Sequence, residues 1–285
     1  MPHTTELLVI DAQNDFCDLP AAWCPTDPAS GRPRRPALPV AGAHADLLRL
    51  AGFIGAAGAR LGGITATLDS HHRHDIAHPP YWRQGDGTAV APFTAITAAQ
   101  VRTGAFTPVR ADERPRTLAY LDALEATGRY TLMVWPLHCQ LGSWGHGLHP
   151  AVLAACNAWE DASHRPVRVV DKGSHPWTEH YSALQAEVPD PAEPATQLNQ
   201  ALLQRLDAVG TLVVAGQASS HCVKATVEHL VQHLPSGRPE RLLLLTDCMS
   251  PVAGFEAEAA AFLAAMQALG VRCLPQAEAL RLLAG

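Results

Sequence analysis

In the stretch Glu6-Leu7-Leu8-Val9-Ile10-Asp11, an unbroken apolar run ends at a carboxylate. Similar short runs recur along the chain, and amphipathic segments separate them. Continuous apolar strands that alternate with helices are typical of a parallel sheet buried on both faces. The sequence therefore predicts a doubly wound α/β fold. The expected strands are 6–10, 63–68, 130–135, 167–170, 211–215 and 242–246, with 271–274 as a small addition, and the expected helices are 41–57, 151–159, 197–206, 222–233 and 256–269.

Two stretches interrupt this alternation. Residues 17–40 contain six prolines and little periodicity, which predicts a long ordered loop. Residues 72–127 exceed a usual strand-to-helix connection, and we expect one helix there, around 118–126. Both insertions follow a strand at the carboxyl edge of the sheet, where such folds bind ligands. They form either a lid over the site or a contact between copies of the chain, within one domain that spans 1–285.

Composition excludes several classes of protein. The formal net charge of -6 disfavours a nucleic-acid partner, which requires a basic face. No run approaches the roughly 20 apolar residues of a membrane span, and the first residues lack the pattern of a signal peptide. We therefore expect a cytoplasmic protein with no membrane partner. The seven cysteines form no CxxC pair, so free thiols are expected, and the apolar helices and proline-rich insertions favour a homo-oligomer.

Three residues near strand ends could carry nucleophilic catalysis. Cys222 follows a strand and a turn of small residues and begins a helix, where the helix dipole favours a thiolate. Asp11 ends the first strand and could accept the thiol proton, whereas His221 points elsewhere on the helix. Lys172 supplies a cation that stabilises the thiolate. The alternatives are a buried structural cysteine, a turn-capping aspartate and a solvated surface lysine.

A second group of residues suggests a metal site. In an extended segment, Asp69 and His71 point to one side of the backbone. His138 follows a neighbouring strand and would complete the set. Two imidazoles and one carboxylate suit zinc, iron or manganese and do not discriminate among them. His78 is the first choice for a fourth ligand, although His72 and His74 also lie nearby.

These motifs resemble the isochorismatase-like cysteine hydrolases, and among them the nicotinamidases most closely. Five segments occur in the order found in that family and together span residues 9–223. They are VIDAQNDFC (9–17), TLDSH (67–71), WPLHCQ (135–140), DKG with YSA (171–173 and 181–183) and GQASSHCV (216–223).

The resemblance implies a three-layer αβα fold with a six-stranded parallel sheet. It implies a cis peptide between Gln217 and Ala218, with the N–H groups of Ala218 and Cys222 facing the oxyanion. Phe16 and Trp135 would enclose a flat substrate ring. In nicotinamidases the metal binds the pyridine nitrogen and positions the amide.

The resemblance predicts that the chain hydrolyses a small carboxamide to an acid and ammonia through a cysteine acyl-enzyme, with a divalent metal, most simply zinc. The chain departs from the nicotinamidases in the segment after His71 and in the long insertion that follows it. Three other readings stay open: hydrolysis of a carbamoyl, ureido or maleamate-type amide, a metalloenzyme in which Cys222 is structural, and a non-enzymatic binding module.

Overall fold

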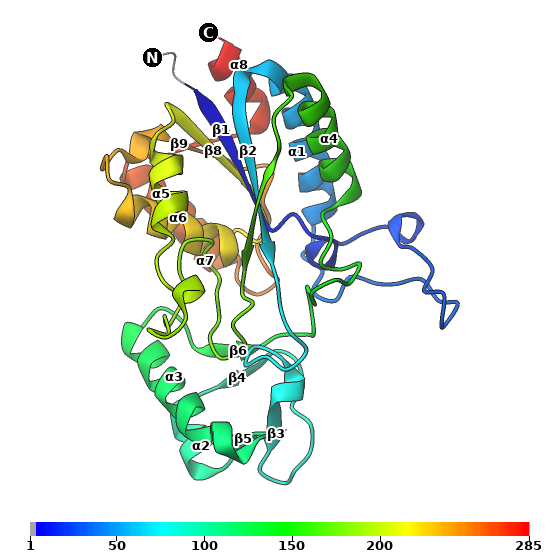
Figure 1. The fold of residues 1–285 in the computed structure, drawn as a ribbon, viewed down its shortest axis with the longest axis vertical. Coiled ribbons are helices and arrows are strands. Elements are labelled where there is room, and N and C mark those ends of the chain that lie inside the picture. Colours follow the sequence, from blue (N-terminus) through cyan, green and yellow to red (C-terminus); the bar gives the residue numbers. More distant parts are fainter. Residues whose placement is uncertain (1–3, 285) are drawn as a thin grey trace.

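The computed structural model describes residues 4–284 and contains a central sheet of six parallel strands between two layers of helices (Figure 1). This arrangement confirms the predicted three-layer αβα fold. The strand order is β10-β9-β8-β1-β2-β7, which places β1 and β8 in the middle. The bounds are β1 Thr5–Ile10, β2 Leu61–Asp69, β7 Arg168–Lys172, β8 Thr211–Gly216, β9 Leu242–Leu245 and β10 Arg272–Leu274.

Helices cover both faces of this sheet, which explains why its central strands are apolar throughout. Leu7 and Val9 of β1 pack in one core with α1, α4 and α8, whereas Leu8 and Ile10 pack in the other with α5, α6 and α7. All four side chains are fully buried. The helices span Ala43–Ala57 (α1), Pro150–Ser163 (α4), Gln200–Asp207 (α5), Cys222–His233 (α6), Glu256–Ala268 (α7) and Gln276–Ala284 (α8).

One expected strand lies outside the central sheet. The apolar run 130–135 contains β6 (Leu132–Val134), which pairs antiparallel with β4 (Thr94–Ile96) in a separate sheet of two strands. The sixth central strand is instead β10, which we expected only as a small addition. Leu132 and Val134 pack with the side chains of the long insertion. A short apolar run indicates a buried strand, but it does not identify the sheet to which that strand belongs.

The insertion 72–127 contains more secondary structure than the single expected helix. It lies beyond the carboxyl edge of the sheet (Figure 1) and has its own apolar core around the fully buried Tyr81 and Trp82. The expected helix is longer than predicted, and the short α2 begins at a capping box of Thr97 and Gln100. The elements are β3 Trp82–Gln84, β4, α2 Ala98–Thr103, β5 Phe106–Pro108 and α3 Arg114–Thr127.

The proline-containing stretch 17–40 is an ordered arm that projects from the body (Figure 1). Asp27 stabilises its tip by accepting hydrogen bonds from the backbone of Ala29 and Ser30, both at 2.9 Å. Near its base, Trp23 packs against the rings of His44 and His149. The ends of the arm return to the carboxyl edge of the sheet.

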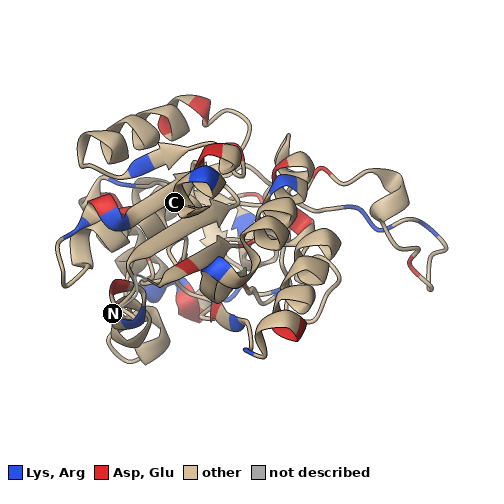
Figure 2. Ribbon diagram, turned by 90° about the horizontal axis from the view of Figure 1, so that it is seen from above, with Lys and Arg blue, Asp and Glu red and all other residues tan. Residues whose placement is uncertain are grey.

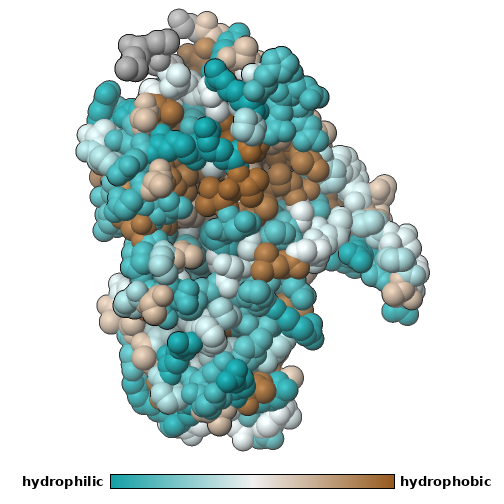
Figure 3. Space-filling view, viewed as in Figure 1, coloured by the Kyte–Doolittle hydropathy of each residue, from teal (hydrophilic) through white to brown (hydrophobic). Residues whose placement is uncertain are grey.

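The surface mixes charged and apolar regions. Acidic and basic residues are interspersed along the elements (Figure 2). Figure 3 shows apolar side chains gathered across the upper half of one face, and Val169 on the edge strand β7 is 54% exposed. No helix within residues 4–284 is long and apolar enough to cross a membrane.

Candidate active site

Four strands of the central sheet bring reactive side chains to its carboxyl edge. Asp11 follows β1, Asp69 ends β2, Lys172 ends β7, and Cys222 begins α6 after the turn that follows β8. The carboxyl ends of parallel strands lie along one edge, so these distant residues meet there. His138 reaches the same place differently, because it follows β6 and not, as we expected, a strand of this sheet.

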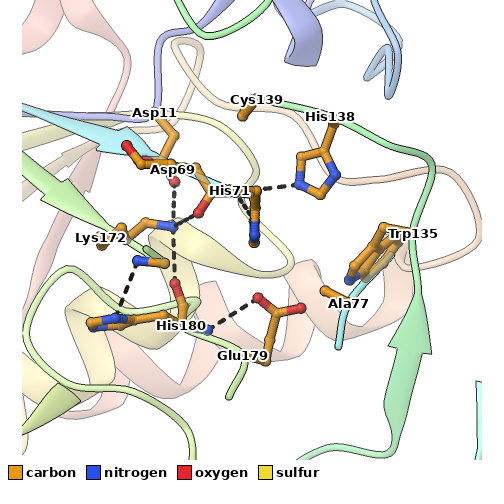
Figure 4. A network of polar contacts seen from close by, with 12 residues as sticks. Asp11, Asp69, His71, Ala77, Trp135, His138, Cys139, Lys172, Glu179 and His180 are labelled. Atoms are coloured by element: carbon orange, nitrogen blue, oxygen red, sulfur yellow. Dashed lines mark hydrogen bonds and ion pairs between the residues drawn. The ribbon is translucent and has the colours of Figure 1, made fainter. Parts of the chain in front are cut away.

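Lys172 lies at the centre of the group (Figure 4). Its Nζ lies 3.0 Å from Asp11 Oδ2, 2.8 Å from Asp69 Oδ1 and 3.6 Å from the Cys222 sulfur. It also donates to the carbonyl oxygen of His180 at 3.0 Å. Burial by itself would lower the pKa of Lys172, but the carboxylates of Asp11 and Asp69 raise it well above its usual value. Lys172 is therefore a fixed cation shared by two carboxylates and the thiol.

Asp11 is fully buried and has a left-handed backbone conformation, with φ of 44°. The hydroxyl of Thr67 on β2 donates to Asp11 Oδ1 at 2.5 Å. The second oxygen, Oδ2, has no hydrogen bond within the described chain and faces the Lys172 ammonium. Burial raises the pKa of Asp11, while Lys172 opposes the shift. One carboxylate oxygen thus accepts from Thr67, and the other forms the ion pair with Lys172.

Cys222 is 6% exposed at the start of α6, and its sulfur lies 3.6 Å from Lys172 Nζ, which also contacts Asp11. Burial raises the pKa of its thiol well above the usual value, although Lys172 acts in the opposite direction. The helix dipole favours the thiolate, but the burial of Cys222, which the sequence does not reveal, favours the neutral thiol. The thiol therefore needs a base to become a nucleophile.

The loop before Cys222 packs closely against β1. The peptide bond between Gln217 and Ala218 is cis, as the resemblance implied. Gly216 has φ of 130°, and a Cβ at this position would lie 1.9 Å from the carbonyl oxygen of Ile10. Only glycine allows this close approach, which places the loop directly beside Asp11.

The three residues predicted to bind a metal lie together. Asp69 Oδ2 is 3.1 Å from His71 Nε2 and 3.3 Å from His138 Nε2. The other ring nitrogen of His71 is 2.9 Å from Asp75 Oδ2, and the other ring nitrogen of His138 is 2.8 Å from the carbonyl oxygen of Pro136. These outer contacts orient both Nε2 atoms toward Asp69, as in many metal sites.

His78 joins this group from the insertion. The ligand atoms of His71, His78 and His138 all lie within 4.8 Å of one another, and all three residues are buried. His78 Nδ1 is 3.2 Å from the carbonyl oxygen of His72, and its Nε2 is 3.1 Å from His138 Nδ1. Burial lowers the pKa of His78 to about 2, so its ring is neutral, the form that binds metals. Three imidazoles and one carboxylate fit a divalent transition metal.

Sequence reasoning did not find Asp75, because a carboxylate four residues after a histidine is common and carries no pattern of its own. It is 1% exposed, and its contact with His71 identifies its role as an orienting residue.

A small cavity opens beside these groups. Phe16 and Trp135, both predicted to contact a substrate ring, line it together with Leu38 from the arm. Trp135 Nε1 donates to the hydroxyl of Tyr181 at 3.1 Å, which fixes the indole. The remaining lining residues are Asp69, His138, Glu179, Tyr181, Ala218, His221, Cys222 and Val252. An apolar cavity with reactive groups at one end suits a small, flat molecule.

Glu179 is a second residue that sequence reasoning missed. Its Oε1 accepts a hydrogen bond from the His180 backbone at 3.0 Å, and its buried Oε2 has no partner within residues 4–284. Burial raises the pKa of Glu179 to about 7, with His71 acting against the shift. Glu179 and Trp135 both line the cavity, and Figure 4 shows them on the same side of Lys172. An unpaired carboxyl oxygen in the cavity wall is available to a ligand.

A larger groove of about 320 Å³ lies between α1 and α4, where Ile54, Ala158 and Trp159 line it. It contains none of the catalytic or metal-binding candidates. The smaller cavity is therefore the candidate active site.

The sequence matches no protein-family model and no curated protein sequence, whereas the fold has clear structural relatives. A nicotinamidase/pyrazinamidase of Acinetobacter baumanii superposes with a TM-score of 0.60 at 19% identity, covering 98% of this chain and 99% of that chain. The yeast nicotinamidase bound to nicotinaldehyde gives a TM-score of 0.60 at 17% identity, covering 95% and 99%.

Two further solved structures extend this likeness. The zinc complex of a Pyrococcus horikoshii pyrazinamidase gives a TM-score of 0.53 at 17% identity, covering 95% of this chain and 99% of that chain. An isochorismatase family protein of Desulfovibrio vulgaris gives a TM-score of 0.52 at 17% identity, covering 99% and 100%. The chain therefore has the isochorismatase-like hydrolase fold, with nicotinamidases and pyrazinamidases among its structural neighbours.

Proposed function

We propose that this protein is a cysteine amidohydrolase that cleaves a small carboxamide to an acid and ammonia, in the manner of a nicotinamidase. The main support for this proposal is the position of the Lys172 ammonium. Its Nζ lies 3.0 Å from Asp11 Oδ2 and 3.6 Å from the Cys222 sulfur, beside an apolar cavity. A cation that contacts both a base and a thiol provides the groups that nucleophilic acyl transfer requires. The solved nicotinamidases of the same fold support the reaction class.

In the first half of the reaction, Asp11 takes the proton of the Cys222 thiol and the sulfur attacks the carboxamide carbon. The backbone N–H groups of Ala218 and Cys222 stabilise the oxyanion. Asp11 then gives its proton to the leaving nitrogen, the C–N bond breaks, and ammonia departs. A thioester between the acyl group and the Cys222 sulfur remains.

In the second half, Asp11 takes a proton from water, whose oxygen attacks the thioester carbon. The C–S bond breaks, and Asp11 returns the proton to the sulfur as the acid leaves. Lys172 remains charged throughout, because its pKa is raised. Its positive charge stabilises the Cys222 thiolate and the Asp11 carboxylate in turn.

Asp69, His71, His78 and His138 would hold a divalent metal at the inner end of the cavity, with zinc as the first expectation and iron or manganese as alternatives. Such an ion would act as a Lewis acid that binds a ring nitrogen or another donor atom of the substrate. Phe16 and Trp135 would enclose the ring, and Glu179 offers its free carboxyl oxygen to a polar substituent.

Ammonia release tests the proposal. The wild-type protein and the Cys222→Ala variant are compared on nicotinamide, pyrazinamide, and a small panel of ureides, carbamoyl compounds and maleamate. Release from nicotinamide that is lost in the variant supports nicotinamidase activity. Cys222-dependent release from another amide keeps the mechanism and changes the substrate. Activity that survives Cys222→Ala favours a metalloenzyme with a structural cysteine, and no release from any amide contradicts the proposal.

We also propose that the chain is one domain, 1–285, and acts in the cytoplasm as a homo-oligomer on a small molecule, with no nucleic-acid or membrane partner. Exposed apolar side chains support the oligomer, among them Val169 on β7 and Leu153 on α4. Light scattering after size-exclusion chromatography measures the mass of the protein in solution, and a monomer at micromolar concentration contradicts the proposed homo-oligomer.

A further inference from the structure

A buried carboxylate on α1 binds the loop that carries the candidate nucleophile. Asp46 lies in the first turn of α1 and is 3% exposed. Its Oδ2 accepts a hydrogen bond from Gln217 Nε2 at 3.0 Å, and its Oδ1 accepts from Arg49 Nη2 at 2.6 Å. A buried carboxylate is retained only where it is paired, and here one of its two partners belongs to the nucleophile loop.

Both polar atoms of the Gln217 side-chain amide form hydrogen bonds. Besides the bond to Asp46, its Oε1 accepts from the backbone N–H of Ser250 at 3.3 Å. Gln217 is fully buried, and it is absent from the cavity lining described above. Its side chain therefore extends from the loop toward α1 and not toward the substrate.

The backbone around Gln217 connects this anchor to the reacting groups. The backbone N–H of Gln217 donates to the carbonyl oxygen of Ile10 at 2.8 Å, and Ile10 directly precedes Asp11. On the other side, the backbone N–H of Ser219 donates to the carbonyl oxygen of Ser250 at 2.9 Å. A displacement of Gln217 thus changes the placement of Ala218 and the loop relative to Asp11.

We propose that Asp46 and Gln217 are positioning residues, which hold the loop 216–222 so that the oxyanion donors and the Cys222 sulfur face Asp11. The inference rests on the proposed amidohydrolase function. Displacements of a fraction of an ångström at reacting atoms are costly, so a lost anchor lowers kcat even though the cavity wall is unchanged.

Exchanging donor and acceptor between the two residues tests the proposal. Gln217→Glu places two carboxylates in contact, so we expect kcat to fall by about 30-fold with KM within about twofold. Asp46→Asn keeps an acceptor for Gln217 and weakens only the contact with Arg49, so a loss of about threefold is expected. The double variant Asp46→Asn with Gln217→Glu restores one amide and one carboxylate, and kcat returns to within about threefold of wild type.

Gln217→Met serves as a second single variant, because it preserves length and cannot be rescued by protonation. We expect its kcat also to fall, with KM unchanged. Glu6→Gln is the matched control: Glu6 is likewise buried, paired with an arginine and bonded to a neighbouring side chain, but it lies at the opposite edge of the sheet. It should lose stability and keep its kcat.

The rate of Cys222 alkylation by iodoacetamide, followed by mass spectrometry of its peptide, gives a readout independent of turnover. We expect it to change severalfold in Gln217→Glu and Gln217→Met and to recover in the double variant. Variants that lose only thermal stability, or a double variant no better than Gln217→Glu, overturn the inference. If the wild type hydrolyses no amide, the proposed function fails, and unchanged alkylation rates in these variants separately refute the positioning role.

Discussion

The two ends of β1 carry similar groups in different surroundings. At the amino end, Glu6 accepts a hydrogen bond from the hydroxyl of Thr65 on β2 at 2.7 Å and forms an ion pair with Arg205. Arg205 also donates to the Thr65 hydroxyl at 2.9 Å, and its side chain is 27% exposed. The three side chains thus satisfy one another, and water reaches the cation.

At the carboxyl end, Asp11 accepts a hydrogen bond from Thr67 on β2 and forms an ion pair with Lys172. Here the cation is 1% exposed, is shared with Asp69, and contacts the Cys222 sulfur. A carboxylate, a threonine hydroxyl and a cation thus occur at both edges. At the amino edge they satisfy one another's hydrogen bonds, whereas at the carboxyl edge one carboxylate oxygen lacks a hydrogen bond to any described residue and the group lies beside a cavity. The surroundings of a carboxylate–cation pair, more than its residue types, therefore distinguish a reactive pair from a structural one.

The largest expected effect comes from Asp11→Asn. The amide cannot accept the thiol proton, so kcat/KM should fall by roughly 10³-fold or more. Folding should be nearly unaffected, because Lys172 keeps its 2.8 Å contact with Asp69. Steady-state kinetics and urea unfolding measure the two quantities. A variant that retains a tenth of the activity would refute the role of Asp11 as the base.

The next effect concerns the metal. Asp75→Asn removes the carboxylate that orients His71, and divalent metal affinity should fall roughly 10- to 100-fold. Competition with a chromogenic chelator measures the affinity. Asp171→Asn is the control, since Asp171 lies at the same edge and contacts Ser70 instead of a ligand. Equal affinities in the two variants would contradict the proposed site.

At the opposite edge, Glu6→Gln should lower stability and leave kcat nearly unchanged, whereas Asp11→Asn should lower kcat/KM and leave stability nearly unchanged. It breaks the pair with Arg205, and we expect a loss of about 1.5 kcal/mol in the free energy of unfolding. The value is moderate because Arg205 is partly exposed to water. The kcat should stay within about twofold of wild type. Chemical denaturation and ammonia release are measured on one preparation, and a large loss of kcat would show that the two edges do not differ in role.

The smallest effect is a displaced pH dependence. Burial raises the pKa of Asp11 above 3.8, so the acidic fall of kcat/KM should lie at a higher pH than for an exposed aspartate. The folded state binds this proton more readily than the unfolded chain, so the contribution of Asp11 to stability increases as the pH falls through its folded pKa. A pH–rate profile locates the fall, and a midpoint at or below pH 3.8 would contradict the raised pKa.

Several features could be predicted from the sequence because they depend on local pattern. The apolar runs identified five of the six central strands, and residues at strand ends identified Asp11, Asp69, Lys172 and Cys222 as residues that would meet. Local pattern did not reveal which strands pair with each other. The run 130–135 has the composition of a central strand, but it pairs with β4 of the insertion.

The sequence by itself determined the α/β class and the set of reactive side chains at the carboxyl edge, because periodicity and strand-end position are local properties of the chain. The tertiary structure decided which apolar run joined the central sheet, which histidine completed the metal-binding group, and that Glu179 faces the cavity. It also decided the contact of Asp46 with Gln217, two residues 171 positions apart. Burial and pairing depend on neighbours that are distant in sequence, and only the folded chain brings those neighbours together.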